Sequence, residues 1–160
     1  MANTQTPAAG QPLARYSSWR RAGDLVLMSG VIAVDPSSGQ VLDRFEQVPE
    51  AVRQELGATG ELSVDVFEAP AVAQSWFVLA RIRQLAEEAG GGMADVVKLV
   101  QYFRDLRHYP AYNRVRGLFY PDAPPVSTVV EVARFLPGDD LVIEVEATMY
   151  LPTPRLARCA

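Results

Sequence analysis

The pattern of hydrophobic and polar residues predicts two short strands near the start of the chain, over residues 13–21 and 25–30. The Ala-Gly-Asp sequence at 22–24 separates them, and its glycine favours a hairpin turn because glycine accepts positive φ. Turn-forming residues gather again at 35–39, and residues 41–42 are predicted to begin a third short strand.

Apolar residues then recur at helical spacing over residues 70–89, which predicts an amphipathic helix lying on a sheet. Its apolar side is Val72, Trp76, Leu79, Ile82, Leu85, Ala86 and Ala89, and its polar side is Gln74, Arg81, Gln84 and Glu88. The glycines at 90–92 end this helix and lack the spacing of a phosphate-binding loop. A second helix is predicted over 110–119, opened by a proline that suits a first turn.

The remaining apolar segments predict strands. Residues 93–106 are apolar at both alternating sets of positions, as in a strand that is covered on both faces. Residues 127–135 and 141–150 are predicted to form a closing hairpin around a turn at 137–139. In the last strand one face is Leu141, Ile143, Val145, Ala147 and Met149, and the other face is Val142, Glu144, Glu146 and Thr148.

These elements predict one α+β domain over residues 13–150, in which two helices back a sheet of about six strands. Residues 1–12 and 151–160 are expected to be flexible tails. Residues 43–63, with a short helix at 50–56, are predicted to form an excursion outside the core and are a candidate lid. Two helices cover only one face of such a sheet, so we expect self-association to cover the mixed apolar face of the closing hairpin.

The composition excludes several classes of function. The net charge of −4 argues against a broad phosphate-binding surface, so no nucleic-acid partner is expected. No segment reaches the roughly 20 consecutive apolar residues that span a bilayer, and the first residues do not resemble a secretory signal. A cytoplasmic location without membrane contact is therefore expected. His108 and Cys159 are the only histidine and cysteine, so we expect no metal site, catalytic thiol or cofactor.

Five stretches, in this order and at this spacing, connect the sequence to a known family. They are GDLVLMSG at 23–30, ADVVKLVQYFRDL at 94–106, YNRVRGLFYPDAPP at 112–125, STVVEVARFLP at 127–137 and IEVEA at 143–147. Together they resemble the RidA/YjgF/UK114 family over about residues 15–150. The resemblance implies a fold like that of the barrel-type bacterial chorismate mutase. It also implies a homotrimer packed sheet to sheet, with small-molecule clefts between neighbouring subunits.

The resemblance further implies an activity and a site. The best-known activity of the family is hydrolysis of reactive enamines and imines to oxo acids and ammonia. Matched motif by motif, the cleft residues of this chain are Tyr16, Ser29, Gly30, Asn113, Val129 and Glu146, with Glu146 as the candidate general base. A structural role is the alternative for each of these: packing for Tyr16, close strand approach for Ser29 and Gly30, helix capping for Asn113, and an interface hydrogen bond for Glu146.

The chain departs from the deaminating members of this family at one position. Those members read Pro-x-Arg-Ser/Thr before the strand, whereas this chain has Ser127 where their arginine binds the substrate carboxylate. A serine cannot form the bidentate, charge-assisted pair that arginine makes with a carboxylate. Three explanations are open: Arg116 or Arg134 reaches the cleft instead, the substrate lacks a carboxylate, or the site binds without catalysis.

Three functions are consistent with these observations. The first is a cofactor-independent hydrolase acting on a small imine, enamine or carbonyl compound, distinct from a typical 2-aminoacrylate deaminase. The second is a non-catalytic, ligand-binding or regulatory trimer. The third, an endoribonuclease, is disfavoured because the acidic chain has neither a histidine pair nor an aromatic and basic strip for RNA.

Overall fold

The computed structural model describes residues 16–35, 37–57 and 63–152. They contain a six-stranded sheet with the order β1-β2-β6-β4-β5, in which β3 also pairs with β6. The strands are β1 (Trp19–Ala22), β2 (Leu25–Met28), β3 (Val31–Ile32), β4 (Val96–Phe103), β5 (Val126–Glu131) and β6 (Ile143–Tyr150). The helices are α1 (Glu50–Glu55), α2 (Ser63–Glu88) and α3 (Tyr109–Phe119), with 3-10 turns at Phe45–Gln47, Met93–Asp95 and Leu106–His108. The predicted α+β class is confirmed.

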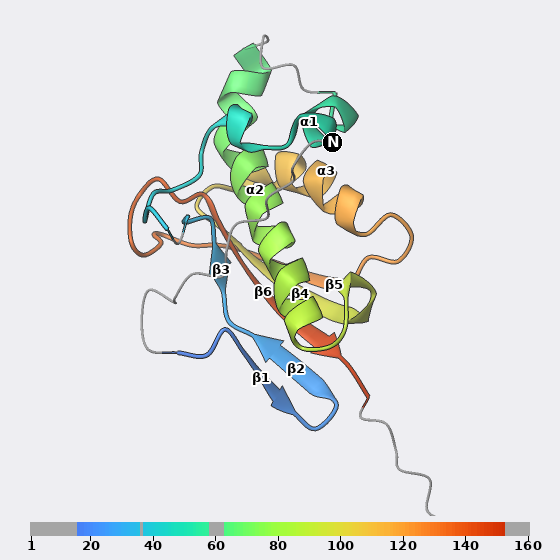
Figure 1. Cartoon of the computed structure of the whole chain (residues 1–160). Coiled ribbons are helices and arrows are strands. Elements are labelled where there is room, and N and C mark those ends of the chain that lie inside the picture. Colours follow the sequence, from blue (N-terminus) through green and yellow to red (C-terminus); the bar gives the residue numbers. More distant parts are fainter. Residues whose placement is uncertain (1–15, 36, 58–62, 153–160) are drawn as a thin grey trace, which may run out of the picture.

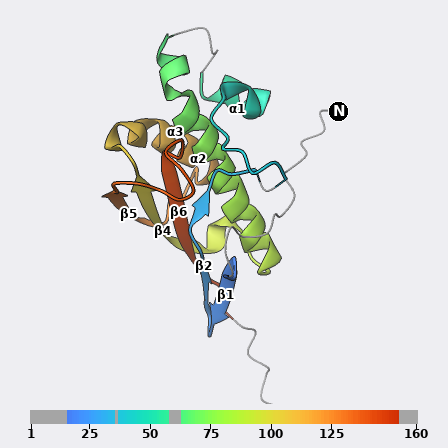
Figure 2. The same ribbon diagram turned by 90° about the vertical axis from the view of Figure 1, so that its left-hand side faces the viewer.

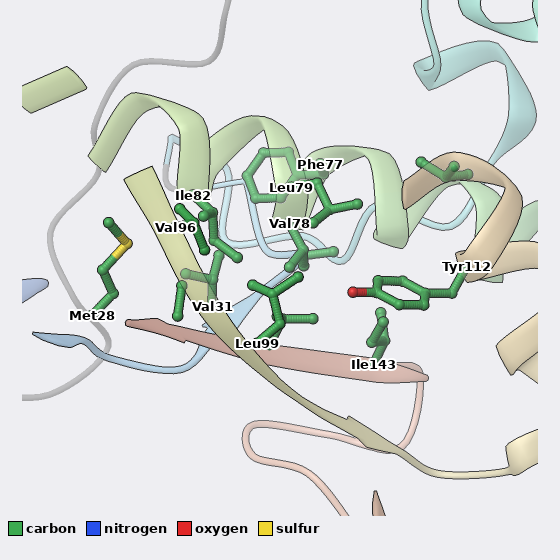
Figure 3. Packing of buried hydrophobic residues seen from close by; sticks show 14 of the residues in the cluster. Met28, Val31, Phe77, Val78, Leu79, Ile82, Val96, Leu99, Tyr112 and Ile143 are labelled. Carbon is green, nitrogen blue, oxygen red and sulfur yellow. The ribbon is translucent and has the colours of Figure 1, made fainter. Parts of the chain in front are cut away.

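Helices α2 and α3 lie on the same face of the sheet (Figure 1). Val78 and Ile82 of α2 are fully buried over Leu99 of β4 and Ile143 of β6, and Tyr112 of α3 fills one end of the core (Figure 3). Burying one such side chain stabilises the fold by about 1.5–3 kcal/mol. The alternation predicted for the last strand is confirmed, because its apolar set faces these helices: Leu141, Ile143, Val145, Ala147 and Met149 are all buried.

Helix α2 begins at Ser63, seven residues before the predicted start at Pro70. A proline inside a helix removes one hydrogen bond and costs about 3 kcal/mol, which is why the sequence favoured a start there. Ala71, Val72 and Ala73 follow the proline and are almost fully buried, and their burial offsets this cost.

The prediction that Gln74 faces solvent is wrong, because its side chain on α2 is fully buried. Its Nε2 donates to the Asp140 carbonyl and its Oε1 accepts from the Val142 amide, both at 2.8 Å. The amide of Gln74 thus satisfies two backbone groups of the segment that leads into β6. This side chain fixes the start of β6 against the helix.

The predicted closing hairpin is also wrong. Strand β5 pairs with β4 in parallel, and β4 lies between β5 and β6. The chain runs from β4 through α3 to β5, and a strand–helix–strand succession places its two strands in parallel. Figure 2 shows β5 at the outer edge of the sheet as a result. Glu146 is therefore not beside the strand that begins near Ser127; it pairs with Val100 of β4.

Part of the predicted excursion at 43–63 belongs to the core, contrary to the sequence interpretation. Phe45 and Val48 are buried in the same hydrophobic cluster as the residues of α2. The short helix predicted at 50–56 is confirmed as α1, which ends at Glu55. Residues 58–62, and the predicted tails except 151–152, lie outside the described residues.

The strands are shorter than the sequence predicted. The first begins at Trp19 although 13–21 was predicted, and residues 13–15 lie outside the described part. The predicted third strand at 41–42 is reduced to an isolated bridge between Val41 and Val34. Strand β5 ends at Glu131, so the last residues of the predicted strand form a loop. The predicted strands are too long because their ends were placed from residue type alone, whereas the observed strands end where hydrogen bonding to a neighbouring strand ends.

The described residues leave the face of the sheet away from the helices open. Strand β4 was predicted to be covered on both faces, but Val100 and Tyr102 are only half-buried on the open face. Apolar residues with large exposed fractions lie on β5 (Val126, 68%), β2 (Leu27, 48%) and the end of β6 (Tyr150, 48%). An apolar surface spread over three strands is typical of a face that another molecule covers. No helix within the described ranges is long and apolar enough to cross a membrane.

We predict that Gln74→Leu lowers the free energy of unfolding by about 2–4 kcal/mol, because two buried backbone groups lose their partner. Urea unfolding followed by circular dichroism measures this change. The matched control is Gln54→Leu on α1, where the amide is exposed and donates to the Glu50 side chain. The free energy of unfolding of that variant should fall by less than about 0.5 kcal/mol. Equal losses in the two variants would contradict the anchoring role of Gln74.

Candidate functional site

A cluster of polar side chains lies where α3 meets the edge strand β5. The Arg116 guanidinium donates from Nη2 to Asn113 Oδ1 at 2.7 Å and from Nη1 to Ser127 Oγ at 3.4 Å. Ser127 Oγ in turn donates to Gln101 Oε1 at 2.8 Å. We name these four residues, Gln101, Asn113, Arg116 and Ser127, the edge cluster. It joins one helix to two neighbouring strands.

The local sequence explains this arrangement. Asn113 and Arg116 are three residues apart on α3 and therefore share one side of the helix. Ser127 and Gln101 lie on the helix side of β5 and β4, because the register pairs Ser127 with Leu99, which is buried under the helices. The Arg116 guanidinium also stacks over the Tyr112 ring, with Cζ 5.9 Å from the ring centroid.

Gln101 is the least expected member of the edge cluster. Its side chain is fully buried, and its Nε2 has no hydrogen-bond partner among the described residues. A buried amide group without a partner costs about 1–3 kcal/mol. Groups of this kind in a native structure call for an explanation, and a functional site is one of them.

A second cluster lies on the open face of the sheet, near the junction of β2, β3 and β6. Glu144 and Glu146 alternate along β6 and point to this face, and Tyr102 of β4 is the cross-strand partner of Glu144. A Cβ on Gly30 would lie 1.9 Å from Glu144 Oε1, so only glycine lets this carboxylate sit against the backbone. Ser29 Oγ donates to the Ser17 carbonyl at 2.7 Å. We name Ser29, Gly30, Tyr102, Glu144 and Glu146 the open-face cluster.

The charges of the open-face cluster perturb one another. Burial, and then the nearby Glu146, raise the pKa of Glu144 above its ordinary value of 4.5. Burial, then Glu146 and Glu144, raise the pKa of the Tyr102 hydroxyl. Because folding raises the pKa of Glu144, the folded state binds this proton more tightly than the unfolded state. As the pH rises from the pKa of Glu144 in the unfolded chain through its higher pKa in the folded chain, the ionisation of Glu144 progressively lowers the free energy of unfolding.

The two clusters occupy different sides of one subunit. Glu146 pairs with Val100 of β4, and Val100 pairs with Thr128 of β5. The residue of β5 that shares the open face with Glu146 is therefore Thr128 and not Ser127. Ser127 points to the opposite face, because successive side chains alternate along a strand. The sheet therefore separates the edge cluster from the open-face cluster. One small ligand cannot contact both clusters of the same subunit.

The other residues predicted for the site lie at its margins. Tyr16 precedes β1 and is half-exposed, close in sequence to the Ser17 carbonyl that binds Ser29. Val129 is the register partner of Gln101 on β5 and is 38% exposed. Arg134 is exposed in the loop after β5 and joins neither cluster through a hydrogen bond of the described residues. Within the described ranges, no group of three His, Cys, Asp or Glu side chains is placed to hold a metal.

Comparison with known proteins decides the family. The model of the family described as Endoribonuclease L-PSP matches residues 51–151. The chain belongs to the RidA/YjgF family. The structure of a Klebsiella pneumoniae protein described as a candidate endoribonuclease is 57% identical, with a TM-score of 0.81 over 86% of this chain and 100% of that one. RidA from an Antarctic Psychrobacter is 25% identical, with a TM-score of 0.69 over 92% and 97% of the two chains.

A curated RidA/YjgF relative carries the name of an activity. The protein called 3-aminoacrylate deaminase RutC from Acinetobacter baylyi is 26% identical over 140 residues, which are 88% of this chain and 90% of its own. The family membership that the motifs indicated is thus confirmed, and so is the fold.

Sequence reasoning found some members of the two clusters and missed others. It identified Asn113 and Ser127, and it named Arg116 as one of two candidates to reach the cleft; the structure brings these three together. It missed Gln101, although a lone amide within an apolar strand was a signal. It also favoured Glu146 over Glu144, because only the structure shows Gly30 against the Glu144 carboxylate.

We predict that Glu146→Gln lowers the pKa of Glu144, because it removes the charge that helps to raise it. The pKa should remain above 4.5, since the burial of Glu144 is unchanged. Carboxyl carbon NMR titration measures the value directly. The control is Glu87→Gln, which removes an exposed carboxylate from α2 and should leave the pKa of Glu144 where it was. An unchanged pKa in Glu146→Gln would show that the two carboxylates do not interact.

Proposed function

We propose that this protein is a divergent RidA-family hydrolase that acts on a small imine, enamine or carbonyl compound in clefts between the subunits of a homotrimer. The observation that carries the proposal is the separation of the two clusters by the sheet. Each cluster is one half of a site, and a second copy of the chain can bring its open-face cluster to the edge cluster of the first. The exposed apolar surface on β2, β5 and β6 supports the assembly that this requires.

The chemistry requires a water molecule and a base. In our proposal, a water oxygen adds to the carbon of a C=N bond while the Glu146 carboxylate accepts a proton from that water. That proton moves to the nitrogen, which gives a carbinolamine. Glu146 then accepts the proton of the new hydroxyl group and passes it to the nitrogen, so that the C–N bond breaks as the C=O bond forms, and ammonia and a carbonyl compound are released. Glu144 and Tyr102 beside Glu146 would orient the water. No metal and no cofactor is needed for this step.

The substrate in this proposal differs from that of a typical 2-aminoacrylate deaminase. Ser127 stands where those members have their carboxylate-binding arginine, and its hydroxyl is bonded to Gln101 and Arg116. The RutC relative named as a 3-aminoacrylate deaminase supports an enamine as the class of substrate. The same change at Ser127 favours the second candidate, a non-catalytic ligand-binding or regulatory trimer.

The family description and the Klebsiella relative also carry the name endoribonuclease. The chain has a net charge of −4 and a single histidine, which gives RNA neither a basic surface nor a histidine pair. We therefore place this activity third. Cleavage of RNA by highly purified protein, lost in Glu146→Gln, would move it to first.

We predict that the protein is a homotrimer, because three strands expose apolar side chains on the open face or the edge. Light scattering on the full chain at micromolar concentration should give three times the mass of one chain. A monomeric mass would contradict the shared site. As a check on the surface involved, Leu27→Asp should reduce the trimer fraction, since it places a charge in the apolar open face.

We predict that Glu146→Gln lowers turnover by about 10²–10⁴-fold in an intact trimer, the usual contribution of a positioned general base. Turnover is measured as ammonia release from freshly generated 2- and 3-aminoacrylate, and the wild type should favour the latter. Glu87→Gln is the control and should keep full turnover, because Glu87 is exposed on α2. Normal turnover in the Glu146 variant would remove it from the mechanism. No turnover of either compound by the wild type would favour the non-catalytic trimer.

A further inference from the structure

Arg116 carries a positive charge that no acidic group of the described residues balances. Several other arginines pair with carboxylates: Arg81 with Glu88, Arg104 with Asp139, Arg107 with Asp105, and Arg114 with Glu68. Arg116, two residues from Arg114 on the same helix, instead contacts two neutral oxygens, of Asn113 and Ser127. A guanidinium has five N–H donors, so these two bonds leave most of its donors available.

The neighbours of Arg116 hold the guanidinium in place without neutralising it. Asn113 Oδ1 holds Nη2 and Ser127 Oγ lies at Nη1, while the Tyr112 ring supports Cζ from below. Ser127 donates its own hydrogen to the buried Gln101, which turns a lone pair of Ser127 Oγ toward Arg116. The side chain is thus fixed at three points, which reduces the entropy lost when it binds a ligand.

We propose that Arg116 is the residue that recognises the substrate, and that the group it binds is a carboxylate. This proposal rests on the proposed function, since it names the substrate class of the same site. A planar fork of N–H donors matches the two oxygens of a carboxylate, and the pair is charge-assisted. The cation is only half-buried and lies beside β5, where Val129, on the same side of the strand as Ser127, is 38% exposed, so a small anion can reach it.

The element that supplies this cation sets the specificity. An arginine at position 127 would extend from the strand, whereas Arg116 enters from α3 and lies against the Ser127 hydroxyl. In this proposal the carboxylate of the ligand is bound on the helix side of β5, by a cation that comes from the helix and not from the strand. The substrate is an oxo or imino acid whose carboxylate is placed for this position, which accounts for the missing arginine without loss of anion recognition.

The experiment compares two charge-matched variants of the full chain, Arg116→Met and Arg114→Met. Methionine keeps an apolar stem over the Tyr112 ring, and both variants remove one positive charge from α3. Dissociation constants are measured by calorimetry or NMR for pyruvate and acetoacetate, and for acetoacetamide as the neutral counterpart of the latter. Light scattering and thermal melting are recorded on the same preparations.

The wild type should bind at least one of the two oxo acids more tightly than acetoacetamide. Arg116→Met should raise the dissociation constant of that oxo acid by about 10–100-fold, which corresponds to the loss of a charge-assisted hydrogen bond. The dissociation constant of acetoacetamide should not change. Arg114→Met should bind like the wild type, because Arg114 pairs with Glu68. Arg116→Lys should recover part of the affinity, since it restores the charge without the fork.

Three results would overturn the assignment. If Arg116→Met binds the oxo acid normally, the cation does not recognise the carboxylate. If that variant loses the trimer or melts earlier with no ligand effect in the remaining trimer, Arg116 is an interface residue. If the wild type binds neither oxo acid at millimolar concentration, the carboxylate assignment fails. Turnover of an uncharged imine in that last case would leave the proposed function standing, and its absence would remove both.

Discussion

The packing of α2 and α3 against a single face of the sheet is the constraint on which the rest of the molecule depends. Helix α2 has 26 residues and is roughly 39 Å long, whereas the eight residues of β6 span roughly 27 Å. The helix is therefore longer than the strand it packs against and extends beyond the sheet at its N-terminal end (Figure 1). Val66 and Phe67 in this part of the helix are exposed. Burial under these helices fixes which side of the central strands β2, β4 and β6 belongs to the core.

The same constraint divides the functional residues. On the helix side, the helices bury residues of the sheet as far as β4 but not those of β5. The polar groups of β5 and α3 meet at this boundary. On the other side, no helix among residues 16–35, 37–57 and 63–152 covers the carboxylates of β6 or the apolar residues beside them. In our proposal the two clusters are half-sites, and copies of the chain cover the apolar face and complete one another's sites. Assembly and site formation are then the same event, and a loss of either should bring a loss of the other.

The sequence predicted the parts of the fold that follow from periodicity. The alternation in β6 placed Ile143 and Val145 correctly on the core side and Glu144 and Glu146 on the other. The sequence did not reveal which strands are neighbours, because β5 and β6 adjoin along the chain but are separated by β4 in the sheet. The strand–helix–strand order was the usable signal, since a helix between two strands favours parallel pairing.

The sequence predicted the site less completely, because polar residues reveal their partners only in three dimensions. Gln74 and Gln101 are both buried amides that apolar patterning could not place. Gln74 satisfies backbone groups and acts structurally, while Gln101 supports Ser127 and keeps an amide nitrogen without a partner among the described residues. The motif comparison showed that an arginine was missing at position 127. Only the geometry shows that Arg116 lies against the serine that replaced it.

In our proposal, each site joins the edge cluster of one copy to the open-face cluster of another. Paramagnetic relaxation between subunits tests it without any substrate. A nitroxide is attached to Val129→Cys in a Cys159→Ser background, and this protein is refolded together with an excess of isotope-labelled wild-type chains. Because the observed chains carry no label, any broadening crosses a subunit boundary. We expect strong broadening of the amide signals of Ser29, Gly30, Glu144 and Glu146, whereas undisturbed signals from these residues in a confirmed trimer would show that the two clusters do not meet.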